Sequence, residues 1–232
     1  MRLARPEKNY EMRIPLTDKA IKVKRSVPVT HHHYNPDDFS RWKDAMKAWI
    51  ESGRSDARVF GPLSAAAKSG RIICFNGAPR SHGFAEAFVA AQLEKDGFDC
   101  WTGVQLFPWN GRRVVAHDRR RNTDAVEAFL ENDGIVVPRS LLPRLAQHQQ
   151  AHGRLKNPDL VCRHRKTGEW RFLEVKRDEA TEKGQLWALV LLQFLTGGSV
   201  GIHRLIPDTR RLPANTSKTE TVRLSAAEVH QR

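Results

Sequence analysis

Apolar and polar side chains alternate along residues 169–176, whose sequence is Glu-Trp-Arg-Phe-Leu-Glu-Val-Lys. Alternation of this kind predicts a half-buried strand, because every second side chain of a strand lies on the same face. One face would carry Trp170, Phe172, Glu174 and Lys176, and the other would carry Arg171, Leu173 and Val175.

A short apolar run at residues 158–164 comes just before this strand and predicts an antiparallel partner for it. Pro158 opens the run, where a strand tolerates proline. Residues 165–168, Arg-Lys-Thr-Gly, supply the turn. The fourteen residues between Asp159 and Glu174 suit two short strands and a tight turn, so this hairpin would bring the two carboxylates level with each other.

The next segments predict a strand–helix–strand unit. Residues 180–196 read as a helix that is apolar on much of its circumference and therefore packs on the sheet. Gly197 and Gly198 follow, and residues 200–206 read as a third strand. This order predicts a crossover between strands of one sheet.

The remaining elements are less regular. Residues 37–51 predict a helix with an apolar stripe, whereas the consecutive histidines 31–33 are expected in a solvated loop. Further expected elements are strands at 99–107 and 112–117 and helices at 122–132 and 140–152.

We expect three parts in the chain: a basic arm and helix at 1–65, an α/β domain at 66–210 with an insertion at about 98–157, and a polar, loosely ordered tail at 211–232.

The predicted hairpin gathers groups that suit metal chemistry. Asp159 and Glu174 would repel each other, and a divalent, oxygen-binding cation such as Mg2+ or Mn2+ would relieve that repulsion. Lys176 shares the strand face of Glu174 and could stabilise a hydroxide or a pentacovalent phosphate. The pattern indicates metal-assisted phosphodiester hydrolysis.

Residues 158–206 resemble the core of the PD-(D/E)xK nuclease superfamily. The hairpin, the Glu-Val-Lys motif and a glutamine nine residues after the lysine resemble its VRR-Nuc-type branch, which is similar to Holliday-junction resolvases. Residues 81–98 match the helix that this branch places before its core, with Glu86 as the acidic residue. The pattern departs from the family at Asn157, where a glycine is common.

The resemblance implies a restriction-endonuclease-like core, with a mixed central sheet flanked by helices and extended by a helical N-terminal segment and an insertion. It implies these metal ligands: Glu86, Asp159, Glu174 and the carbonyl of Val175. It also assigns Lys176 to the nucleophile or the transition state and Gln185 to the orientation of the site.

Simpler readings of these residues remain open. Glu-Val-Lys on an exposed strand can be a solvated ion pair, and a first-turn Glu86 interacts well with the helix dipole. Glu94 on the same helix could replace Glu86, Gln185 could be an ordinary first-turn glutamine, and His82 could contact phosphate or simply lie at the surface. The cysteines at positions 74, 100 and 162 have no zinc-site spacing and are expected to be buried.

The net charge of +13 and the pI of about 10.2 favour a polyanionic partner such as nucleic acid. Candidate phosphate contacts are the clusters Lys22-Lys24-Arg25, Arg112-Arg113 and Arg119-Arg120-Arg121. With no membrane-length apolar segment and no secretory signal, we expect a cytoplasmic protein without a membrane partner.

The leading hypothesis is a Mg2+- or Mn2+-dependent nuclease, with DNA favoured over RNA and internal cutting over exonuclease action. The alternatives are a non-cleaving nucleic-acid-binding or assembly module and a nuclease subunit that is active only with a partner. A partner subunit would dock on two tryptophan-rich faces, Trp42 with Trp49 and Trp101 with Trp109; the alternative partner is a second copy of the chain. Hydrolysis of a smaller phosphorylated substrate is a third alternative.

Overall fold

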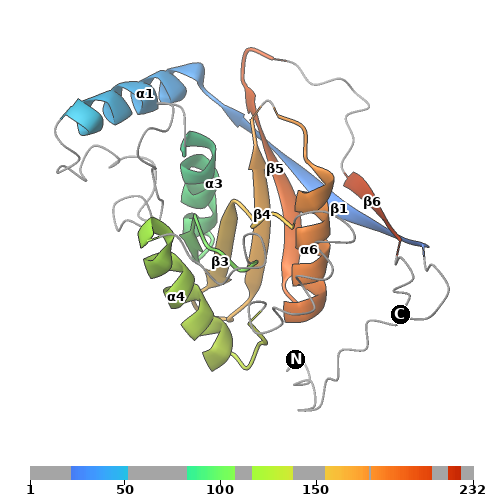
Figure 1. The fold of residues 1–232 in the computed structure, drawn as a ribbon. Coiled ribbons are helices and arrows are strands. Elements are labelled where there is room, and N and C mark those ends of the chain that lie inside the picture. Colours follow the sequence, from blue (N-terminus) through green and yellow to red (C-terminus); the bar gives the residue numbers. More distant parts are fainter. Residues whose placement is uncertain are drawn as a thin grey trace.

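Six strands in the described part of the chain form one open, mixed sheet in the order β2-β3-β4-β5-β1-β6 (Figure 1). The computed structural model describes residues 22–51, 83–107, 117–137, 155–177, 179–210 and 219–225. The strands are β1 (Lys22–Tyr34), β2 (Phe98–Trp101), β3 (Leu160–His164), β4 (Trp170–Lys176), β5 (Ser199–Pro207) and β6 (Thr219–Ser225). The four helices that flank the sheet are α1 (Pro36–Glu51), α3 (Phe84–Lys95), α4 (His117–Asn132) and α6 (Lys183–Thr196).

The hairpin and the crossover are confirmed. β3 and β4 pair antiparallel, with Leu160 opposite Leu173. β4 and β5, which precede and follow α6 in the chain, pair parallel. The return from α6 into β5 is tight, because a Cβ on Gly198 would lie 2.9 Å from both the Phe172 ring and the Trp170 carbonyl oxygen. Only glycine fits this close approach without a shift of the backbone.

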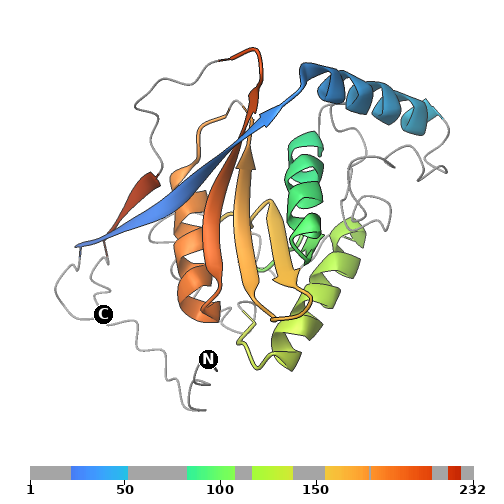
Figure 2. The same ribbon diagram turned by 180° about the vertical axis from the view of Figure 1, so that it is seen from behind.

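Helices cover both faces of the sheet, with α6 in front of it in Figure 1 and behind it in Figure 2. α4 and α6 contribute to one core cluster, and α1 and α3 contribute to the other. Trp170 and Phe172 belong to the first cluster, whereas Leu173 and Val175 belong to the second. β4 is therefore buried on both faces and the predicted half-buried strand is wrong, because a strand in the middle of a doubly covered sheet has no solvent side.

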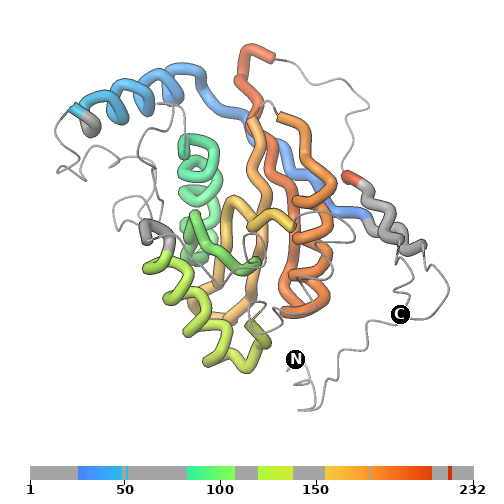
Figure 3. The backbone as a smooth tube through the Cα atoms, viewed as in Figure 1, coloured from blue at the N-terminus to red at the C-terminus, as the bar shows by residue number. Residues whose placement is uncertain are grey.

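β1 corrects the expectation for the N-terminal arm. The histidines 31–33 lie in this strand and not in a solvated loop. β1 lies beside β5 (Figure 3). It runs parallel to β5 over residues 29–34 and antiparallel to β6 over residues 22–28. Val27 and Val29 are buried while Ser26, Pro28 and Thr30 are exposed, so the period-2 pattern was present among the basic residues.

The segment at 219–225 corrects the expectation of a loosely ordered tail. It forms β6, which adds to β1 at the edge of the sheet. The strand expected at 99–107 is limited to β2, and the helix expected at 122–132 begins earlier, at His117. The helix expected at 140–152 and most of the strand expected at 112–117 lie outside the described residues.

One tryptophan of each face expected to dock a partner is buried. Trp42 and Trp101 are 2% and 5% exposed and pack in the core, whereas Trp109 and the side chain of Trp49 lie outside the described residues. Cys100 and Cys162 are buried free thiols, as expected. Over the described ranges no helix has both the length and the apolar character needed to cross a membrane.

Candidate active site

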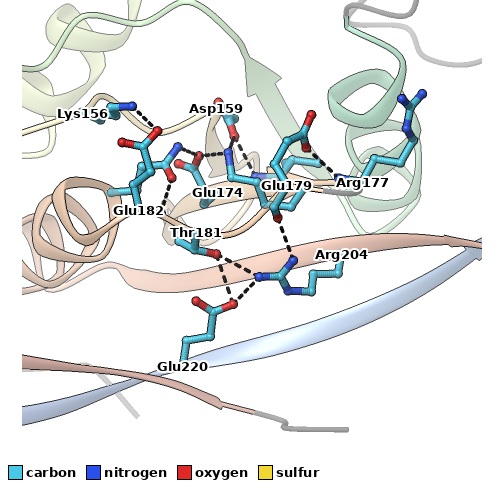
Figure 4. A network of polar contacts seen from close by, with 12 residues as sticks. Lys156, Asp159, Glu174, Arg177, Glu179, Thr181, Glu182, Arg204 and Glu220 are labelled. Carbon is cyan, nitrogen blue, oxygen red and sulfur yellow. Dashed lines mark hydrogen bonds and ion pairs between the residues drawn. The ribbon is translucent and has the colours of Figure 1, made fainter. Parts of the chain in front are cut away.

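The hairpin register brings Asp159 to the end of β4. Asp159 directly precedes β3, and its Oδ2 accepts a hydrogen bond of 2.9 Å from the backbone N–H of Val175. The Nζ atom of Lys176 lies 2.5 Å from Oε1 of Glu174 and 3.5 Å from Oδ2 of Asp159. The ammonium of Lys176 therefore contacts both carboxylates that sequence reasoning paired, Asp159 and Glu174, which Figure 4 labels.

The first turn of α6 adds Gln185 to this group. Its Nε2 donates to Oε1 of Glu174, and its Oε1 accepts a 2.8 Å hydrogen bond from the backbone N–H of Glu182, the N-cap. Lys156 forms an ion pair with Glu182 and holds the same end of the helix. Gln185 thus fills the ordinary capping role of a first-turn glutamine with its oxygen and contacts the site with its nitrogen.

α3 brings Glu86 close to the same place. Burial and, to a smaller extent, the charge of Asp159 raise the pKa of Glu86 to about 7, while the charge of Lys176 acts in the opposite direction. The charges of both groups therefore reach Glu86. Glu94 is eight residues further along α3, about 12 Å away along the helix axis, so it does not replace Glu86. His82 lies outside the described residues.

Glu174 is fully buried, and burial together with the charge of Asp159 raises its pKa to about 9. Its Oε2 atom has no hydrogen-bond partner among the described residues. Burial lowers the pKa of Lys176, but the charges of Asp159 and Glu174 outweigh burial, so this pKa lies above its ordinary value. The two neighbouring carboxylates therefore favour the charged form of Lys176.

The donor set fits a hard divalent cation in kind. Carboxylate oxygens are its preferred ligands, and Oε2 of Glu174 is buried without a hydrogen-bond partner among the described residues. The backbone of Val175 faces Asp159 along the β3 edge of β4, which directs its carbonyl to the same edge. Within the described residues, however, no three His, Cys, Asp or Glu side chains are gathered closely enough to hold an ion.

Sequence reasoning missed Glu179, Thr181 and two partners on distant strands, Arg204 and Glu220. Glu179 lies in the segment after β4, and its charge contributes to the raised pKa of Glu86. That segment has no hydrophobic periodicity, so the only available signal was its position between Lys176 and Gln185.

The positive charge of the chain is unevenly distributed. Of the 39 Lys and Arg residues, 21 lie in the described ranges, together with 20 of the 26 Asp and Glu residues. Arg120 and Arg121 are exposed on α4, but the other expected phosphate contacts are outside the described residues or have side chains that are not described. The described elements together carry almost no net positive charge, so their charge does not favour a nucleic-acid partner.

Comparison with known proteins adds no relative: no protein-family model, no curated protein and no solved structure matches the chain. Its function is therefore argued from the arrangement of these side chains.

Proposed function

We propose that this chain is a metal-dependent nuclease of the PD-(D/E)xK type with a restriction-endonuclease-like core. It would cut nucleic acid, DNA in preference to RNA, at internal phosphodiester bonds. The observation that supports this most is the meeting of Asp159, Glu174, Lys176 and Gln185 at one end of the β3–β4 hairpin, with Glu86 approaching from α3.

When bound, Mg2+ or Mn2+ would supply Lewis-acid stabilisation of the phosphate and a more acidic water. The residues that would hold it are Glu86, Asp159, Glu174 and the carbonyl of Val175. Gln185 keeps Oε1 of Glu174 in place through its amide, and the N–H of Val175 does the same for Oδ2 of Asp159.

Lys176 has an electrostatic role. Its raised pKa keeps the ammonium charged at neutral pH, so it donates hydrogen bonds and offsets the negative charge that develops on the phosphoryl oxygens. Removal of one such preorganised donor typically lowers the rate by about 10^2- to 10^3-fold.

A second candidate is a nucleic-acid-binding subunit that needs a partner, or a second copy of the chain, for cutting. Two observations favour it: the described residues gather no three metal-binding side chains, and the described elements are nearly neutral. A partner could supply both a missing ligand and positive charge.

The test is cleavage of linear duplex, supercoiled plasmid, branched and single-stranded DNA and RNA with Mg2+, with Mn2+ and with EDTA. Wild type is compared with Asp159→Asn, with Lys176→Ala and with the control Lys166→Ala, which removes an exposed turn lysine at the other end of the hairpin. We expect metal-dependent cutting in wild type and the control only. A wild type that binds these substrates but cuts none of them in either metal contradicts the nuclease and favours the partner-dependent subunit.

A further inference from the structure

The segment between β4 and α6 links two groups of the candidate site. It begins directly after Lys176 and ends at the helix whose first turn carries Gln185. It therefore joins the strand end that carries Lys176 to the helix turn that carries Gln185. Contacts from β5 and β6, two strands that follow α6 in the chain, hold this segment (Figure 4).

Arg204 on β5 provides the first of these contacts. It is paired with Lys176 across the parallel β4–β5 ladder, so the two side chains lie on the same face of the sheet. Its Nη1 donates a 3.0 Å hydrogen bond to the carbonyl oxygen of Glu179, and its Nη2 donates a 3.2 Å hydrogen bond to Oγ1 of Thr181. One guanidinium thus holds the segment at two points.

Glu220 on β6 holds the guanidinium in turn. Its Oε1 lies 2.5 Å from Nη2 of Arg204 and accepts a 3.1 Å hydrogen bond from Oγ1 of Thr181. The side chains of Arg204 and Glu220 are 25% and 24% exposed, so water screens this pair less than a surface ion pair. The three side chains form a closed triangle that ties the sheet edge to the segment.

We infer that Arg204 is a positioning residue for the candidate site and that Glu220 makes β6 part of that function. The inference rests on the proposed function, because the groups it positions are Lys176 and Gln185. Loss of the guanidinium frees the segment and moves both groups relative to Glu174. Because Arg204 acts through the segment, its loss lowers kcat and leaves KM nearly unchanged.

Hydrogen exchange measured by mass spectrometry tests the positioning without any substrate. We expect the amides of residues 179–185 to exchange about tenfold faster in Arg204→Ala than in wild type, because charge-assisted hydrogen bonds are lost. Arg204→Lys and Glu220→Gln should give intermediate rates. The matched control is Arg171→Ala, which removes an arginine from β4 on the opposite face of the sheet, where it pairs with Glu169. Unchanged exchange in Arg204→Ala overturns the inference.

Cleavage kinetics provide the second readout. We expect kcat of Arg204→Ala to fall about ten- to hundredfold with KM within twofold of wild type, and Arg204→Lys to recover part of the loss. Faster exchange combined with a wild-type kcat overturns the positioning role. A wild type that cuts nothing overturns the proposed function instead, and exchange alone then decides whether Arg204 anchors the segment.

Discussion

Asp133 joins the end of α4 to the hairpin that carries the candidate site, and its removal tests how firmly the two are connected. Its two carboxylate oxygens accept hydrogen bonds of 2.8 Å from Nε and Nη2 of Arg163 on β3, and Oδ2 also accepts a 2.8 Å hydrogen bond from Nε1 of Trp170 on β4. The same guanidinium lies over the ring of Phe129, 5.2 Å from its centroid. One carboxylate therefore connects two strands with the helix.

The expected cost of Asp133→Ala follows from these contacts. A hydrogen bond to a charged group contributes about 1.5 to 3 kcal/mol, but the Asp133 and Arg163 side chains are each 22% exposed, which reduces that figure. We expect the free energy of unfolding to fall by about 2 to 3 kcal/mol. For a chain of this size that corresponds to a Tm lower by roughly 5 to 10 °C.

The effect should depend on pH in a defined direction. The hydrogen bond from Arg163 lowers the pKa of Asp133 from its ordinary value of 3.8, so the carboxylate stabilises the fold fully above that value. The contribution is lost as the pH falls through the lower pKa of the folded protein. The difference between wild type and Asp133→Ala should therefore be constant near neutral pH and should shrink in acid.

The assay is urea unfolding followed by tryptophan fluorescence at several pH values. Asp133→Asn keeps an acceptor for Trp170 and should lose less stability than Asp133→Ala. Glu131→Ala is the control, because it removes an exposed acidic side chain from the same helix. If Asp133→Ala lies within about 0.5 kcal/mol of wild type, the reasoning from these three hydrogen bonds is refuted.

Three further predictions concern other parts of the fold. Gly198→Ala should lower the free energy of unfolding by about 1 to 3 kcal/mol in urea titrations, because its Cβ would meet Phe172, and an unchanged midpoint would contradict this packing. Burial, with a smaller effect of His32, lowers the pKa of His203 to about 3. As the pH falls below 6.5, the free energy of unfolding of wild type should therefore decrease by up to about 1.4 kcal/mol per pH unit relative to His203→Gln. Parallel curves of stability against pH for the two proteins would contradict the lowered pKa. Gln185→Ala should reduce cleavage and lower stability by about 1 kcal/mol, whereas Gln185→Glu should retain the cap and still impair cleavage; equal activity of both variants with wild type would remove Gln185 from the site.

The sequence predicted the parts of the fold in which neighbours in the chain are neighbours in space. The β3–β4 hairpin and the β4–α6–β5 crossover depend on short-range patterns, and the register of that hairpin already brought Asp159 level with Glu174. β1 and β6 were missed because the short period-2 pattern of β1 stands among basic residues and β6 stands in a segment that reads as a polar tail. Their stability comes from pairing, and His32 on β1 bonds to His203, 171 residues away.

In the candidate site, too, features set by local sequence patterns were predicted and features set by the packing of distant elements were not. Lys176 was predicted on the correct face because a strand has a fixed period of two. The ammonium between the carboxylates, the double use of the Gln185 amide and the anchoring by Arg204 all depend on distances that the chain acquires only when separate elements pack. Glu86 could be proposed from the resemblance alone, since more than seventy residues separate it from Asp159.

The position of β1 between β5 and β6 has a consequence for synthesis on the ribosome. Both of its backbone edges pair with strands that are translated more than 160 residues later. At ~5 to 20 residues per second, the nascent strand stays unpaired for roughly 10 to 30 s. An open edge of this kind can add to another chain. Fragments that stop before residue 199 would keep both edges of β1 open permanently, so we expect prematurely terminated chains to aggregate and full-length chains to depend on whatever shields β1 until β5 emerges.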